Sequence, residues 1–336
     1  MITGNQSWVF NNKPVITSTA TVSGPFEGKS NLGNEIDLVY SDLYMNQPSY
    51  EQAHQQLIED AIKLTVQHAN LRYQDIDFLI SGDLINQMTP TNFAARVHKI
   101  PFIGFFNACA TSTGSLALAA LMINNNAAKQ VITGAASHNG AVEKQFRYPT
   151  EYGAQKPPTA QWSVTGAGFS LLSQTGTGPI VTSATIGRVI DFNQTDPFNM
   201  GAAMAPAAAD TIVNHLADRK LSIDYYDLIV TGDLGTVGLN ILFDLLKKEQ
   251  IYPQKEQLID AGASIYRDDQ NVFAGGSGAG CSSLYMYGRL VKDLKNKKIQ
   301  RVLVVATGSL LSPLSTLQKQ SIPVIAHAVS IESEGM

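Results

Sequence analysis

The sequence repeats itself in order, and this repeat restricts the folds that are open to the chain. "PVITSTATV" (Pro14–Val22) resembles "PIVTSATIG" (Pro179–Gly187), and "LRYQDIDFLISGDL" (Leu71–Leu84) resembles "LSIDYYDLIVTGDL" (Leu221–Leu234). Two later pairs keep the same order: "CATSTGSLALAALM" with "CSSLYMYGRLVKDL", and "KQVITGAAS" with "QRVLVVATG". The repeat spans about half of the 336 residues, too long a period for a solenoid. We therefore predict a duplicated domain, with halves at residues 1–175 and 176–336.

Each half alternates short apolar runs with helical patterns. "DFLISGDL" and "DLIVTGDL" are apolar on both faces, which is typical of buried parallel strands. Apolar residues at helical spacing precede both runs, so we predict an α/β fold with helices packed on largely parallel sheets. Ligands in such folds bind beyond the carboxyl ends of strands. Asp83, Cys109, Ser137 and Asp233 all fall at predicted strand ends.

Composition excludes several classes of function. The formal charge is -4 with Lys and Arg scattered, which argues against a nucleic-acid partner. Two cysteines are too few for a disulfide framework, which indicates a reducing compartment. The start, "MITGNQSWVF", shows no signal-peptide pattern, and no apolar run reaches the roughly 18 residues of a membrane span. We expect a protein that is not secreted and has no transmembrane segment, either cytoplasmic or peripheral at a membrane.

Cys109 is the candidate for chemistry, because it lies between a predicted strand and a predicted helix that begins at Thr111 or Ser112. N–H groups and the helix dipole at such a junction favour a thiolate or a bound anion. A free cysteine is equally often a small buried hydrophobic residue, so this position alone leaves both readings open. Cys281 follows the glycine-rich stretch "AGGSGAG" and is expected to be a packing residue.

The segment "NACATSTGSLALA" resembles the cysteine turn of the thiolase and ketoacyl-synthase superfamily. "ASHNGAVEKQFRYPTEYG", "AMAPAAADTI", "LIVTGDL" and "VFAGGSGAGCS" further resemble the stage V sporulation protein AD family of spore-forming bacteria. The resemblance implies the duplicated five-layer αβαβα fold of thiolases and a homodimer. It also implies binding of dipicolinic acid, or its calcium chelate, for uptake into the developing spore. The implied partners are membrane proteins of the same sporulation operon, and the implied location is the forespore or spore inner membrane.

The superfamily's catalytic set is incomplete here. Condensing enzymes activate their cysteine with His and Asn, or with two His. Where the resemblance places the second-half His, "TGDLGTVG" offers Asp233, and the nearest counterpart of the Asn is Ser277. This difference favours a binding pocket on an enzyme scaffold.

A dicarboxylate ligand requires cations, N–H groups and an aromatic face. We predict a ligand site from residues at strand ends and in the loop "QFRYPTEYGAQK". Its members are Cys109, Ser137, His138, Arg147, Tyr148, Tyr152, Lys156, Arg188, Asp233 and Ser277. His54, His68, His98 and His215 are expected at the surface. No metal-ligand spacing is present in the sequence, and no cofactor is implied.

Three functions therefore remain open from the sequence. The first is a dipicolinate-binding protein without a complete catalytic set. The second is an acyl-transferring enzyme of the thiolase or ketoacyl-synthase type that uses Cys109. The third is a non-catalytic assembly scaffold for membrane partners.

Overall fold

The computed structural model describes residues 1–146 and 155–335, and its largest sheet is built from two halves of the same design. The first half orders its strands β3-β9-β7-β5-β6, and the second half orders them β10-β15-β14-β11-β12. In each half the last three strands of this order are parallel to each other, and the first two join antiparallel. The halves meet where Val15 of β3 pairs with Ile180 of β10.

The matched segments of the sequence occupy equivalent strands. In the first half these strands are β3 (Val15–Ser23), β5 (Phe78–Gly82), β6 (Phe102–Gly104), β7 (Gln130–Ser137) and β9 (Gly166–Ser173). In the second half they are β10 (Ile180–Ile186), β11 (Leu228–Thr231), β12 (Leu258–Asp260), β14 (Arg301–Ser309) and β15 (Val324–Glu332). The prediction of a duplicated α/β fold is thus confirmed. The boundary at residue 175 lies in the loop between β9 and β10, and it stays a prediction.

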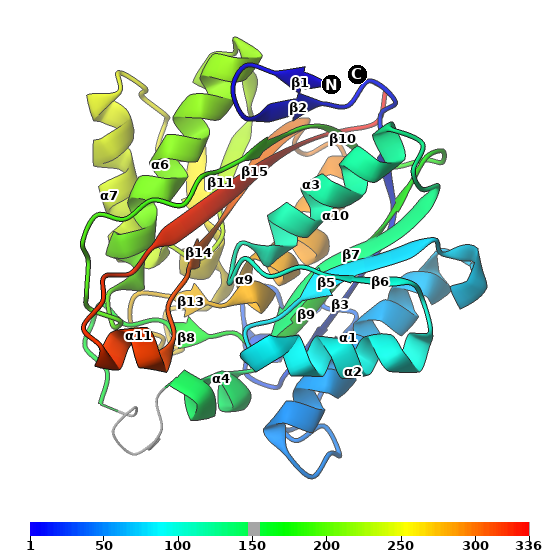
Figure 1. Cartoon of the computed structure of the whole chain (residues 1–336), viewed down its shortest axis with the longest axis horizontal. Helices are drawn as coiled ribbons and strands as arrows, with labels where there is room; N and C mark the ends of the chain where they lie inside the picture. Colours follow the sequence, from blue (N-terminus) through cyan, green and yellow to red (C-terminus); the bar gives the residue numbers. More distant parts are fainter. Residues whose placement is uncertain (147–154, 336) are drawn as a thin grey trace.

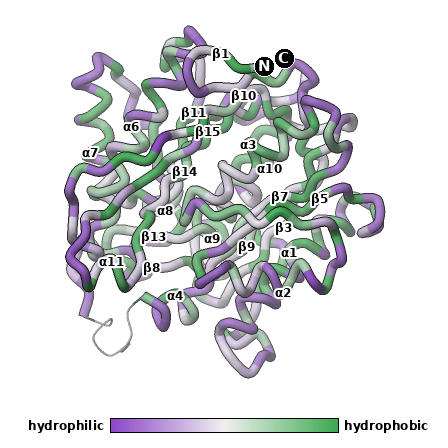
Figure 2. The backbone as a smooth tube through the Cα atoms, in the orientation of Figure 1, coloured by the Kyte–Doolittle hydropathy of each residue, from purple (hydrophilic) through white to green (hydrophobic). Residues whose placement is uncertain are grey.

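Helices form three layers around the two halves of the sheet (Figure 1). α1 (Tyr50–His68) and α2 (Thr89–His98) cover one outer face, and α6 (Met200–Arg219) and α7 (Gly235–Lys248) cover the other. Between the halves lie α3 (Thr111–Asn124) and the run of α9 (Ala279–Tyr285), η6 (Met286–Leu290) and α10 (Val291–Lys295). α3 is apolar around most of its surface because both halves pack against it. Figure 2 shows hydrophilic residues mainly on the outer helices and loops.

Shorter elements complete the described residues. The strands are β1 (Ile2–Thr3), β2 (Ser7–Val9), β4 (Leu38–Val39), β8 (Trp162–Ser163) and β13 (Gly276–Ser277). The helices are α4 (Asn139–Phe146), α8 (Ala261–Ile265), α11 (Pro313–Leu317), η1 (Glu27–Lys29), η2 (Gly33–Glu35), η3 (Tyr73–Asp75), η4 (Asn86–Met88) and η5 (Ile223–Tyr225). Among the helices just described and those of the main layers, none has the length and apolar character needed to cross a membrane.

One expectation from the sequence is wrong. His54, His98 and His215 are buried rather than at the surface, because the inner faces of their helices pack on the sheet. Burial lowers the pKa of His54 and of His215 to about 3. Cys109 precedes α3, whereas Cys281 lies fully buried inside α9.

Candidate functional site

A cavity of about 260 Å³ lies beside Cys109, at one end of the molecule where α4 and α11 come together (Figure 1). Most of its wall is apolar and comes from segments far apart in the chain. These residues are Leu84, Phe106, Ala108, Val142, Phe146, Pro197, Phe198, Met200, Leu311, Pro313 and Leu317. The polar wall residues are Cys109, Ser163, Ser277, Ser309 and Thr316, with Gly278 beside them. Within the described part of the chain, no charged side chain lines this cavity.

Asp233 lies directly behind the polar wall. Its carboxylate accepts hydrogen bonds from the Ser277 hydroxyl at 2.9 Å, the Gly278 N–H at 3.0 Å and the Thr307 hydroxyl at 3.0 Å. These donors come from β13, the start of α9 and β14, so Asp233 joins three elements of the second half. Burial raises the pKa of Asp233 to about 6, so the side chain is mainly ionised at neutral pH.

The Cys109 thiol faces this carboxylate. Burial raises the pKa of the thiol well above its usual value, and the charge of Asp233 and hydrogen bonding to it raise it further. The Gly278 N–H and the Ser277 hydroxyl act in the opposite direction but are smaller effects. A nucleophilic cysteine needs a neighbouring cation or base that stabilises the thiolate. Here the neighbour is an anion, so Cys109 is a protonated thiol at neutral pH.

Ser137 and His138 lie outside the wall of this cavity. The Ser137 hydroxyl donates to the Val164 carbonyl at 2.7 Å and accepts from the Gly280 N–H at 3.0 Å, which ties β7 to the start of α9. The His138 ring donates from Nε2 to the Leu43 carbonyl at 2.8 Å, and burial lowers the pKa of His138 to about 4. Both side chains hold neighbouring segments together.

The two described members of the predicted basic and aromatic wall, Lys156 and Arg188, lie apart from each other. Lys156 pairs with Glu143 at 2.9 Å and lies over the Trp162 ring, and it is not among the residues that line the cavity. Arg188 is 70% exposed and pairs with Asp210 at 2.7 Å on the outer layer. Arg147, Tyr148 and Tyr152 lie outside the described residues.

The structure therefore brings Cys109, Asp233 and Ser277 together, with Ser137 behind the wall residue Gly278, and it leaves His138, Lys156 and Arg188 outside the cavity wall. Sequence reasoning missed Ser309, Phe198 and Met200. Ser309 is one residue beyond the matched segment "QRVLVVATG", and extending the repeat by that residue would have placed it at a strand end like Ser137. Nothing in the sequence distinguishes the apolar wall residues from ordinary core residues.

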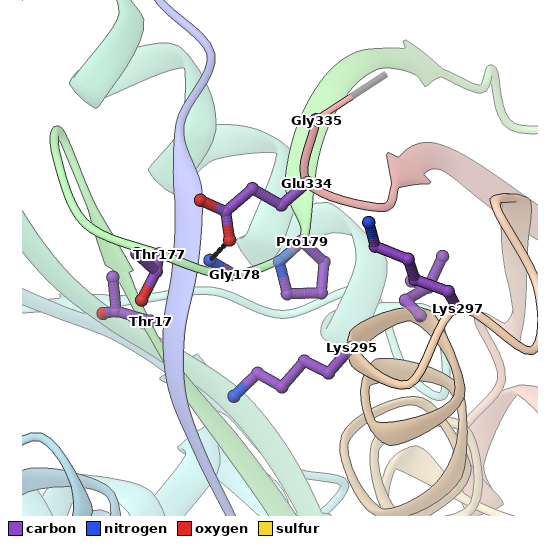
Figure 3. Close-up of a pocket in the computed structure, with 9 residues that line it drawn as sticks. Thr17, Thr177, Gly178, Pro179, Lys295, Lys297, Glu334 and Gly335 are labelled. Atoms are coloured by element: carbon purple, nitrogen blue, oxygen red, sulfur yellow. Dashed lines mark hydrogen bonds between the residues drawn. The ribbon is translucent and has the colours of Figure 1, made fainter.

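A second cavity of about 540 Å³ lies between the β9–β10 loop and the end of α10 (Figure 3). Lys295, Lys297 and Glu334 line it, and Glu334 accepts the Gly178 N–H at 3.0 Å. Burial and the charge of Lys292 lower the pKa of Lys295. Among the described residues, none of the predicted site members lines this cavity, whereas Cys109 and Ser277 line the cavity at Cys109.

The fold and the cysteine turn define the class of this protein. The structure resembles 3-oxoacyl-[acyl-carrier-protein] synthase III from Aquifex aeolicus with a TM-score of 0.57 and 12% identity, over 95% of this chain and 99% of that one. It resembles cerulenin-bound OleA of Xanthomonas campestris with a TM-score of 0.61 and 11% identity, over 96% of this chain and 97% of that one. The chain thus has the thiolase-like fold of the ketoacyl synthases, as the sequence predicts.

Sequence comparison identifies the family within this class. Residues 4–332 match the family model of stage V sporulation protein AD (SpoVAD). The chain is 48% identical to stage V sporulation protein AD of Bacillus subtilis (strain 168), over 99% of this chain and 98% of that protein. The protein belongs to the stage V sporulation protein AD family.

Proposed function

We propose that this sporulation protein binds dipicolinic acid, or its calcium chelate, in the cavity beside Cys109 and does not catalyse condensation. The family relationship supports the ligand class. The observation that carries the absence of catalysis is the Asp233 carboxylate facing the Cys109 thiol.

The chemistry of the site supports binding over acyl transfer. Attack by a cysteine requires a thiolate and donors to the developing oxyanion. Asp233 raises the pKa of the thiol and, when ionised, offers no proton to an oxyanion. A missing general base alone costs ~10²–10⁴-fold in rate. Cys109 then serves as part of the cavity wall.

The cavity suits a flat ring with two polar ends. Apolar side chains such as Phe146 and Leu311 cover a ring, while the Ser309 hydroxyl, which has no partner among the described residues, is available for a carboxylate oxygen. The described lining has no charge, which favours the neutral calcium chelate or a dianion with added cations. Arg147 follows Phe146 directly in the sequence and is the proposed cation.

Calorimetry with purified protein tests the ligand. We expect wild-type protein to bind dipicolinate, with and without equimolar calcium, and to bind neither pyridine nor benzoate comparably. Cys109→Ala should bind dipicolinate with little loss of affinity, because the thiol only forms part of the cavity wall. Arg147→Ala should weaken binding at least about tenfold. Arg147→Lys should weaken it too, because an ammonium group cannot form the bidentate hydrogen bonds of a guanidinium with a carboxylate.

Arg188→Ala is the matched control, because this exposed arginine already pairs with Asp210. It should bind dipicolinate like the wild type. Equal binding of dipicolinate and benzoate by the wild type would refute the proposal.

The two other functions have distinct signatures. An acyl-transferring enzyme would form an acyl adduct on Cys109 with acyl-CoA, detectable by mass spectrometry. A scaffold would bind no dipicolinate yet retain its membrane partners. We further propose that the protein acts as a homodimer, peripheral at the forespore or spore inner membrane, with membrane proteins of the same operon.

A further inference from the structure

Helix α6 begins at the cavity with an uncapped N-terminus. Its first residue, Met200, lines the cavity, and its N-cap residue, Asn199, makes no side-chain capping hydrogen bond. The N–H of Ala203 bonds to Asn199, but those of Met200, Gly201 and Ala202 find no acceptor in residues 1–146 and 155–335. No acidic residue lies in the first turn.

Some helices of the chain close this end with a side chain, whereas α2, α3, α7, α9 and α10, like α6, have no side-chain cap. Ser49 caps α1, Asp260 caps α8 and Ser312 caps α11, each through a side-chain oxygen. The first N–H groups of a long helix carry a partial positive charge that favours an anion. With 20 residues, α6 is the longest of the described helices, and its open end lies on a cavity wall where the described residues place no charged side chain.

An independent observation at the same cavity points to a ligand. Ser309 lines the cavity and is only 9% exposed, and its Oγ has no hydrogen-bond partner among the described residues. A buried hydroxyl without a partner is costly. Other buried hydroxyls of the described residues, such as those of Thr133 and Ser183, also lack partners, but Ser309 is the one on the cavity wall, where a bound acceptor would complete its bonding.

The other polar part of the wall already holds an anion. The Asp233 carboxylate, behind Cys109, accepts hydrogen bonds from the Ser277 hydroxyl and the Gly278 N–H. A ligand carboxylate placed against Cys109 would face this charge. The end of the cavity at α6 has no such charge in its first turn.

We propose that the N-terminus of α6 and the Ser309 hydroxyl form a carboxylate subsite, which takes one carboxylate of a planar aromatic acid. The inference rests on the proposed function for the identity of the acid, and it adds where the acid is held. The N–H groups and the hydroxyl donate to the carboxylate oxygens, and the apolar wall covers the ring.

Two variants test the subsite by calorimetry with dipicolinate, isophthalate and benzoate. Asn199→Asp places a carboxylate of nearly the same size at the open helix end, where it competes with the ligand. We expect binding at least about tenfold weaker, while the melting temperature stays equal or rises because an acidic N-cap stabilises a helix. Ser309→Ala should weaken binding about tenfold, and Ser309→Thr, which keeps the hydroxyl, should restore most of it.

Ser49→Asp is the matched control, because it adds the same charge at the N-cap of α1 and should leave binding unchanged. Unchanged binding by both Asn199→Asp and Ser309→Ala would overturn the subsite even if the wild type binds dipicolinate. If the wild type binds isophthalate or benzoate in preference to dipicolinate and Asn199→Asp abolishes that binding, the subsite stands and the proposed function fails. A wild type that binds none of the three acids overturns both.

Discussion

The Asp233 carboxylate is expected to suppress the reactivity of Cys109, and its removal should make the thiol reactive. In Asp233→Asn the charge is lost but the burial of Cys109 remains. Two charges ~4 Å apart interact by about 4 kcal/mol at an effective dielectric constant of ~20, which corresponds to roughly 3 pKa units. The pKa of Cys109 should therefore fall substantially and stay above that of a free thiol, since burial is the larger cause of its elevation.

Alkylation by iodoacetamide at pH 8, followed by mass spectrometry of each cysteine, measures this change. Because the thiolate is the reacting species, we expect the rate at Cys109 to rise at least about tenfold in Asp233→Asn. Cys281 is fully buried, and because the charge of Asp233 raises its pKa as well, its slow alkylation serves as a check that the variant stays folded. The variant should also melt earlier, because the new amide NH₂ faces hydroxyl and N–H donors.

Asp83→Asn is the matched control. Asp83 follows the first-half repeat "SGDL", and burial raises its pKa to about 6, as for Asp233. It bonds Thr91 and Ile85 rather than the cavity wall, so its removal should leave the alkylation rate at Cys109 unchanged. An alkylation rate in folded Asp233→Asn that equals the wild-type rate would refute the electrostatic argument.

Three further outcomes are expected. Burial raises the pKa of Glu27 to about 7, so the folded state binds this proton more tightly than the unfolded state. Protonation of Glu27 should therefore increase the free energy of unfolding by about 3 kcal/mol as the pH falls from 8 to 4.5. Denaturant titrations of Glu27→Gln should lack this gain. Gly278→Ala should destabilise the fold, because φ of Gly278 is +105° and the added Cβ would lie 2.6 Å from the Ser137 hydroxyl. Adding Ser137→Ala removes the contact but not the backbone strain, so the double variant should recover only part of the lost stability, and full recovery in thermal unfolding would contradict this. Light scattering at micromolar concentration should give twice the 36.2 kDa mass of the chain, whereas a monomer at all concentrations would count against the homodimer.

The sequence predicts the topology well because each strand can be recognised from its own few residues and each matched pair of strands occurs once in each half. "DFLISGDL" and "DLIVTGDL" become β5 and β11, which hold the same place in their halves. It also places Cys109 at a strand-to-helix junction. The cavity was harder to predict, since Leu84, Phe198 and Leu317 meet only after the chain has folded. The burial of Ser137 likewise depends on Gly280, 143 residues away.

The two "GDL" turns show how one duplicated scaffold can acquire a single site. Asp83 accepts hydrogen bonds from the Thr91 N–H at 2.9 Å and the Thr91 hydroxyl at 2.5 Å, and so fixes the start of α2. In the second half, Asp260 bonds the Leu234 and Gly235 N–H groups at 2.8 and 2.9 Å and fixes the start of α7. Asp233 is thereby not needed at the start of α7 and instead bonds Ser277 and Gly278 behind the cavity wall. The same residue type in matched positions thus stabilises a helix in one half and determines the chemistry of the cysteine in the other.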